Sequence, residues 1–204
     1  MGIAATFRMG AAAILAAMAA GPALAQFSDS YSFLKAVRDG DPTETQKYLD
    51  KPGAPALNSR DPATGETALH ILVKRHDTSW LPVMLARGAQ TEIRDNNGDT
   101  PLMMAATLSD PEAIRLLLDY HANVNTADGQ GETPIIVAVQ HRDLPTIRLL
   151  MASGADPRRA DHITGKSARD YAQEDSRGGA TILKMLDQAK PAAGSATVAG
   201  PVPR

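Results

Sequence analysis

The sequence predicts an all-α solenoid, built from helix-turn-helix units stacked along one axis. Within its 204 residues, a glycine, a charged residue, and a threonine or serine followed by proline or alanine recur as one phrase. The threonines at Thr67, Thr100 and Thr133 are 33 residues apart, and Ser167 occupies the next place, 34 residues on. Periods of about 20 to 50 residues are typical of repeat proteins, in which each unit buries its apolar face against its neighbours.

A second phrase keeps the same spacing, because Gly88-Ala89, His121-Ala122 and Gly154-Ala155 are again 33 residues apart. Together with Thr100-Pro101-Leu102, this phrase resembles the turn and loop sequences of the ankyrin repeat family. The resemblance covers residues 33–188. It implies a solenoid of stacked helix pairs with β-turn fingers, and a concave face that grips another protein.

One departure from the family pattern concerns the histidine that follows the repeated threonine. His70 keeps this histidine, whereas Met103 and Ile136 stand at the matching positions. We therefore expect weaker side-chain hydrogen bonding in the turns of the later units.

Residues 1–25 have the composition of a secretory signal peptide. Arg8 is the only charged residue there, an alanine-rich run follows, and Ala23-Leu24-Ala25 offers small residues for cleavage. The run is shorter than the roughly 20 apolar residues of a membrane-spanning helix, so an uncleaved anchor is the weaker alternative. A lipoprotein anchor is excluded because the chain has no cysteine. Cleavage after Ala25 predicts a periplasmic protein, with secretion as the alternative.

The formal charge of −2 limits the partners that the chain can attract. Without Arg8 the mature chain is more acidic still, and an acidic surface holds neither nucleic acid nor an anionic membrane. The lack of cysteine also means that no disulfide supports the fold. Stability must therefore come from the packed repeats.

The N-terminal part of the mature chain reads as a leader and a capping unit. Residues 26–32 are serine-rich and are expected to form the leader, and the first helical pattern begins at Phe33. Residues 33–60 are then a degenerate unit that caps the stack. Asp41 is the expected N-cap of its second helix, with Pro42 at the first helical position.

Three full units follow, each with a finger, an inner helix and an outer helix, at residues 61–94, 95–127 and 128–160. In the second of them, Asp110 is the expected N-cap of the outer helix. The apolar residues around Leu117 have helical spacing, which predicts one buried face.

Pro82 interrupts the outer helix of the first full unit. Because proline is tolerated only in the first turn of a helix, this helix is expected to start late. The pattern predicts Ser79 as N-cap and Trp80 as the first helical residue.

The last unit, residues 161–188, is more polar, as a C-terminal cap requires. Residues 189–204 have no periodicity and little apolar content, so they are expected to form a disordered tail.

The titratable residues form no recognisable catalytic or metal motif. No histidine lies in a metal-binding motif, and zinc needs several converging ligands. Aspartates recur with the repeat period and are expected to accept hydrogen bonds from turn amides. No serine lies in a nucleophile elbow. We expect no catalytic residue, no metal and no cofactor, and hence no enzyme.

The candidate binding surface consists of the fingers and the exposed ends of the inner helices. Its predicted members are Glu66, Lys74, Arg75, Arg94, Asn96, Asn97, Asp99, Thr107, Leu108, Gln130, Glu132, Gln140 and His141. Among them, Lys74, Arg75 and Arg94 are expected to form a solvated basic patch. A surface of mixed charge suits a folded protein partner with a polar rim.

These observations favour a periplasmic adaptor or regulator that binds another exported protein through the concave face. An inhibitory or protective subunit of an exported enzyme is one alternative, and a structural component of the envelope is another. A polar face without a dedicated partner is the simplest alternative, since surface polarity is the default. Neither nucleic acid nor membrane insertion after cleavage is expected, and the isolated chain is expected to be a monomer.

Overall fold

The computed structural model describes residues 21–54 and 56–188. They belong to two compact units that meet between Ala56 and Leu57. Most of the predicted signal peptide, and the whole predicted tail at residues 189–204, lie outside the described residues.

The first compact unit contains α1 (Gly21–Asp39) and α2 (Pro42–Leu49), which pack against each other. The rings of Phe33 and Tyr48 meet edge to face, with their centroids 6.3 Å apart. This aromatic pair adds to the contact between the two helices.

The predicted start of the first helix at Phe33 is wrong. The described part of α1 runs from Gly21 to Asp39 and includes residues 26–32, which the sequence marks as a leader. Neither glycine nor proline occurs between Pro22 and Gly40, so no strong helix breaker interrupts this segment. Serine lowers helix propensity too little to end a helix on its own. The predicted cleavage site after Ala25 therefore lies inside α1.

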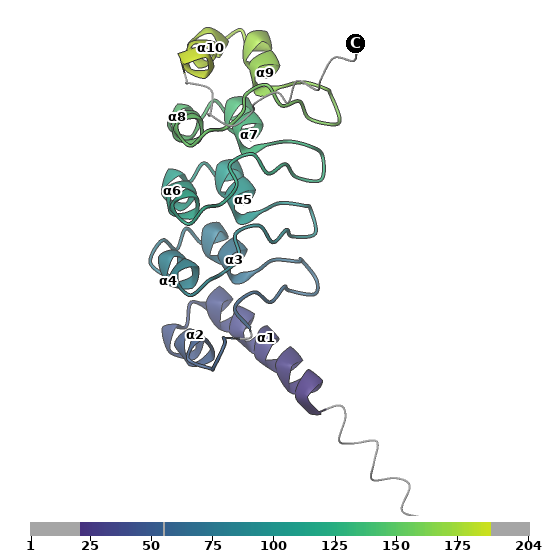
Figure 1. The fold of residues 1–204 in the computed structure, drawn as a ribbon, viewed down its shortest axis with the longest axis vertical. Helices are drawn as coiled ribbons and strands as arrows, with labels where there is room; N and C mark the ends of the chain where they lie inside the picture. Colours follow the sequence, from purple (N-terminus) through teal and green to yellow (C-terminus); the bar gives the residue numbers. More distant parts are fainter. Residues whose placement is uncertain (1–20, 55, 189–204) are drawn as a thin grey trace, which may run out of the picture. The chain divides into compact units, whose positions relative to one another are not determined.

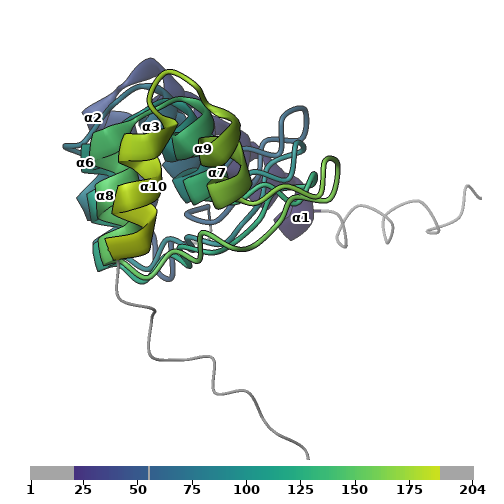
Figure 2. The same ribbon diagram turned by 90° about the horizontal axis from the view of Figure 1, so that it is seen from above.

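The described part of the second compact unit contains two layers of helices (Figure 1). The inner layer comprises α3 (Ala68–Lys74), α5 (Pro101–Thr107), α7 (Pro134–Gln140) and α9 (Ala168–Glu174). The outer layer comprises α4 (Leu81–Ala86), α6 (Pro111–Asp119), α8 (Leu144–Ala152) and α10 (Gly179–Gln188). Figure 2 shows that the fingers of this unit project on the side of the inner helices.

The prediction of an all-α solenoid is confirmed. In the second compact unit each helix contacts its partner in the same repeat and the equivalent helix of an adjacent repeat. Among the described residues no β-strand forms, and Ala160 and Ser167 make only an isolated bridge.

Two predicted N-caps, at Asp41 and Asp110, are confirmed. The carboxylate of Asp41 accepts the amide hydrogen of Thr43 at 2.9 Å, and that of Asp110 accepts the amide hydrogen of Ala113 at 3.0 Å. Both caps satisfy amides that have no partner inside the helix.

The late start before Pro82 is also confirmed, but the predicted cap is one residue early. Trp80 is the N-cap of α4 and Leu81 its first residue, which places Pro82 in the first turn. Asp77 accepts the amide hydrogen of Trp80 at 3.2 Å, and the hydroxyl of Ser79 donates to Asp77 at 2.6 Å. The Ser79 oxygen is therefore used as a donor and does not cap the helix.

His121 takes the place of a loop glycine, as predicted. Gly88 and Gly154 follow outer helices with φ angles of 89° and 88°, and His121 follows α6 with φ of 64°. A side chain is strained in this left-handed region, but His121 is exposed and meets no steric obstacle to its ring.

Three residues with a positive φ angle lie two positions after an inner helix, and two of them join their repeat to the next one. His76, with φ of 53°, places Nδ1 2.7 Å from the carboxylate of Asp110, the N-cap of the next outer helix. Two joints further on, Arg142 makes a similar connection, with two hydrogen bonds at 2.6 and 2.7 Å to Asp175, the C-cap of α9. At the joint between these two, the equivalent residue is Ser109.

Ser109 is too short to make such a connection. The N-cap that it should reach is Asp143, whose Oδ1 accepts the amide hydrogen of Thr146 at 3.1 Å. The other carboxylate oxygen, Oδ2, is buried and has no hydrogen-bond partner among the described residues. An unpartnered buried oxygen destabilises the folded state, so this joint is weaker than its neighbours.

Leu117 provides a test of the core. Its side chain is 0% exposed, on the face of α6 that is turned toward neighbouring helices. We expect Leu117→Ala to lower the free energy of unfolding by about 2 to 5 kcal/mol, because a cavity remains. Leu116→Ala, at a half-buried position of the same helix, should cost clearly less. Urea denaturation measures both, and the reverse order would contradict the core assignment.

Ser109→Arg should strengthen the incomplete joint. The backbone of Ser109 already has φ of 52°, close to the 56° of Arg142, so arginine introduces no new backbone strain. We expect a gain in unfolding free energy of about 1 kcal/mol, as Asp143 Oδ2 acquires a charged donor. Ser109→Ala is the matched control and should change little. Equal stability of the arginine variant and the parent would show that Oδ2 needs no partner.

Candidate protein-binding face

The fingers are held by aspartates that recur with the repeat period. In each finger the first carboxylate accepts amide hydrogens of the turn, at Asp61, Asp95, Asp128 and Asp161. Asp128 Oδ1, for example, accepts those of Gln130 and Glu132, both at 2.8 Å. The prediction that these acids serve turn geometry is therefore confirmed.

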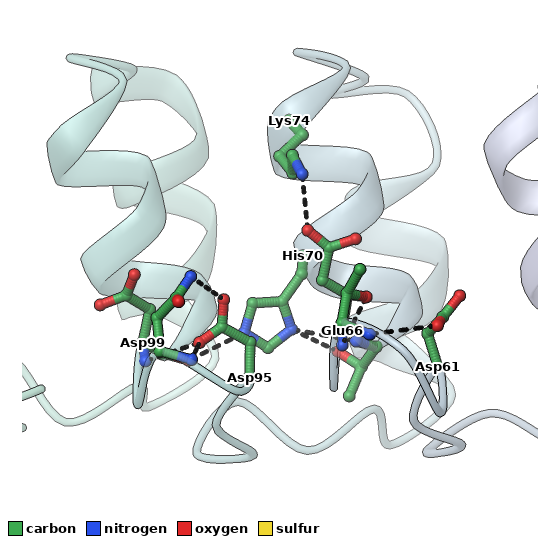
Figure 3. A network of polar contacts seen from close by, with 9 residues as sticks. Asp61, Glu66, His70, Lys74, Asp95 and Asp99 are labelled. Carbon is green, nitrogen blue, oxygen red and sulfur yellow. Dashed lines mark hydrogen bonds and ion pairs between the residues drawn. The ribbon is translucent and has the colours of Figure 1, made fainter. Parts of the chain in front are cut away.

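His70 links the first full repeat to the second, as Figure 3 shows. Its Nδ1 accepts the amide hydrogen of Thr67 at 3.1 Å, so the ring hydrogen is on Nε2. Nε2 then donates to the carbonyl oxygen of Asp99 at 3.0 Å. Because burial disfavours the charged ring, the pKa of His70 is lowered and the neutral form persists.

The turns of the second and third full units have fewer side-chain bonds, as predicted, whereas in the last unit Ser167 and Asp170 bond reciprocally. Where Met103 replaces the histidine, Thr100 Oγ1 still accepts the Met103 amide hydrogen, at 3.3 Å. Where Ile136 replaces it, Thr133 Oγ1 is buried and has no partner among the described residues. The histidine is thus the only residue of the three that can reach the neighbouring finger from this position.

A second set of bonds connects the fingers to the far ends of the inner helices. Each joins the residue before the helix N-cap to the last residue of that helix, eight positions on: Glu66 to Lys74 at 2.6 Å, Glu132 to Gln140 at 2.8 Å, and Lys166 to Glu174 at 2.6 Å. Figure 3 shows the first of these. The second repeat lacks this bond, because the Thr107 hydroxyl donates to the Met103 carbonyl.

The three residues of the predicted basic patch are all exposed, but each already has a polar partner within the chain. Lys74 is paired with Glu66, which is only 7% exposed, and Arg75 lies 3.8 Å from Asp77. Arg94 lies at the base of the fingers, where its guanidinium donates to the carbonyl oxygens of residues 98 and 127. Its long side chain bridges two repeats, so Arg94 supports the fold.

The other predicted residues lie in two rows. On the fingers, Asn96 and Gln130 are exposed, and the Asn96 amide donates to the carbonyl of Ala63 at 2.9 Å. At the inner-helix ends, the exposed residues are Thr107, Leu108, Gln140 and His141. Asn97 is exposed beside Asp95, to which its side-chain amide donates at 3.3 Å. Of the predicted residues, Glu66 is buried and Asp99 and Glu132 are half-buried, whereas the others are exposed.

The sequence analysis missed two features of this face. Ile163, at the tip of the last finger, is a large apolar side chain with 72% exposure. A groove of about 500 Å³ lies between the ends of α7 and α9, lined in part by Tyr171, Ser176 and Arg177. The groove brings together two inner helices from different repeats, which the sequence pattern alone does not place side by side.

The described residues contain no group of three potential metal ligands among histidine and the acids. Nor does any helix among them combine the length and the apolar character that a bilayer crossing requires.

Asp99 is half-buried beneath this face and its protonation is perturbed. Burial, with the negative charges of Asp95, Asp128 and Glu132, raises the pKa of Asp99 to about 6. A raised pKa means that the folded state binds the proton more tightly than the unfolded state. The stability that Asp99 contributes is therefore present at low pH and is lost as the pH rises through about 6.

Asp99→Asn should consequently stabilise the protein at about pH 8 but not at about pH 4. Because Asp99 is half exposed, solvent screening should keep the gain below about 1 kcal/mol. Urea denaturation of variant and parent at both pH values measures it. Asp119→Asn, at an exposed position on α6, is the control and should show no such difference. A pH-independent effect of Asp99→Asn would contradict the raised pKa.

Comparison with known proteins agrees with this geometry. A family model for ankyrin repeats, comprising three copies, matches residues 33–128 and 77–161. Over 49 residues the chain is 47% identical to a protein of Acanthamoeba polyphaga mimivirus named as an ankyrin repeat protein. That match covers 24% of this chain but 7% of the viral protein, so the chain spans a small part of that relative. Because the family model covers more than half of the residues, the chain belongs to the ankyrin repeat family.

Proposed function

We propose that this ankyrin repeat protein is a periplasmic adaptor or regulator, which binds another exported protein through its fingers and inner-helix ends. Ankyrin repeats are protein–protein interaction modules. The proposal of export is supported by the signal-like composition of residues 1–25. Binding alone is the proposed mechanism, since the acids of the fingers are occupied by turn amides.

The observation that carries this proposal is a contrast between buried and exposed positions in the repeats. The N-cap of every inner helix is a buried threonine or serine: Thr67, Thr100, Thr133 and Ser167. The last helical residue and the one after it are different in every repeat: Lys74-Arg75, Thr107-Leu108, Gln140-His141 and Glu174-Asp175. The fold thus requires a threonine or serine at the buried position, whereas it accepts side chains of very different chemistry at the other two positions.

Positions at which the fold accepts different side chains can be adapted to a partner and so serve recognition. They lie on successive inner helices of one layer, so together they form one continuous surface. Their side chains are cationic, apolar, polar and anionic in turn, which gives a surface of mixed character. Such a surface suits a folded protein with a matching pattern of charges better than an apolar small molecule.

Site-specific photo-crosslinking tests the face. Because the chain has no cysteine, single cysteines at Leu108 and His141 can each carry a photoreactive group without competing sites. Both residues are exposed at inner-helix ends. In a periplasmic extract of the native cells, both variants should crosslink to the same protein. Arg148→Cys, at an exposed position of outer helix α8, is the control and should not.

Adducts from position 148 alone would rule out the proposed face. The same extract tests export, because N-terminal sequencing of the purified protein should begin at Gln26. A chain that is found only in the cytoplasm with residues 1–25 intact would rule out the periplasmic assignment.

A further inference from the structure

The lining of the groove between the ends of α7 and α9 includes two apolar surfaces among polar side chains. These are the buried side chain of Val139 and the half-buried ring of Tyr171. The Tyr171 hydroxyl donates to Asp161 at 2.8 Å, which fixes the orientation of the ring. A fixed aromatic surface beside an aliphatic side chain is suited to an apolar group of a partner.

Most charges around the groove are already paired. Arg142 makes two hydrogen bonds to Asp175, and Glu174 is bonded to Lys166. Hydrogen bonds from Arg142 and from the backbone amide of Arg177 lower the pKa of Asp175 to about 2. Asp175 is therefore ionised at neutral pH and its charge is balanced by Arg142.

Arg177 is the cationic residue of the groove lining that has no hydrogen-bonded side-chain partner among the described residues. Its guanidinium is exposed and makes no hydrogen bond or ion pair with any described side chain, and the same holds for the Ser176 hydroxyl. Two arginines and two carboxylates, Glu174 and Asp175, line the groove, but only the guanidinium of Arg177 has no hydrogen-bonded partner among the described residues. An exposed guanidinium next to a hydroxyl without a partner can donate hydrogen bonds to a carboxylate.

We propose that this groove binds an acidic segment of the protein partner, with a carboxylate against Arg177 and an apolar side chain against Tyr171. The proposal rests on the proposed function and names the chemistry of its partner. Gln140, Glu174 and Arg177 are all exposed, so the groove is open along its rim. An open groove of this size suits an extended protein segment, whereas small molecules are usually enclosed on most sides.

Fluorescent peptides provide the test. One set carries glutamate next to leucine within an otherwise neutral sequence, and a second set has glutamine in place of each glutamate. Binding to the full chain is measured by fluorescence anisotropy. We expect the glutamate peptides to bind at least about tenfold more tightly than the glutamine peptides, because only they pair with Arg177.

Two variants assign that difference to the groove. Arg177→Glu should abolish the preference for glutamate, and Arg177→Gln should reduce it and weaken its dependence on salt. Arg148→Glu carries the same change in charge on the outer helix α8 and should keep the preference. Circular dichroism confirms that each variant is folded.

Equal binding of the two peptide sets, no binding of either set, or an unchanged preference in Arg177→Glu would each overturn the proposal. The crosslinking at Leu108 and His141 is an independent readout. If those positions still capture one partner while Arg177→Glu leaves its capture unchanged, the adaptor function holds and the groove is not its contact.

Discussion

The solenoid is built from helices that are too short to be stable in isolation, so it depends on the packing between repeats. Each inner helix has seven residues, and isolated helices of that length are unstable in water. They persist because small and aliphatic side chains such as Ala106, Ile136 and Ala138 are completely buried between consecutive repeats. Every repeat therefore relies on its neighbours, and the interfaces between repeats determine both the stability and the shape of the binding face.

Features that follow from local rules could be predicted from the sequence. The 33-residue period predicts the number of repeats. Short-range hydrogen bonding explains the N-caps at Asp41 and Asp110 and the role of the aspartates in the fingers. The errors were also local. The N-cap of α4 is Trp80 and not Ser79 as predicted, because the Ser79 hydroxyl donates to Asp77 instead. The start of the first helix was predicted too late, at Phe33, because the serines of residues 26–32 lower helix propensity only slightly and do not end the helix.

Contacts between repeats could not be predicted, because they depend on distances that the sequence does not contain. A lysine and two arginines on an acidic chain look like a free basic patch. In the structure Lys74 bonds to a residue eight positions earlier, and Arg94 to a carbonyl 33 positions later. The groove was missed for the same reason, since Tyr171 and Val139 belong to different repeats.

Comparison of the repeats with one another shows how a single position can serve both stability and recognition. The second residue after α3, α5 and α7 has a left-handed backbone. In the third full repeat this residue is Arg142, which pairs with Asp175 and so connects the last two repeats, while Arg177 keeps no hydrogen-bonded side-chain partner among the described residues. In the second full repeat the equivalent residue is Ser109, which does not reach the next repeat, and a buried oxygen of Asp143 has no partner among the described residues. The same geometry thus yields a firm joint with a charged groove at one place and a weaker, uncharged joint at another. The difference arises from side-chain length and charge alone, since the φ angles of the two residues differ by only a few degrees.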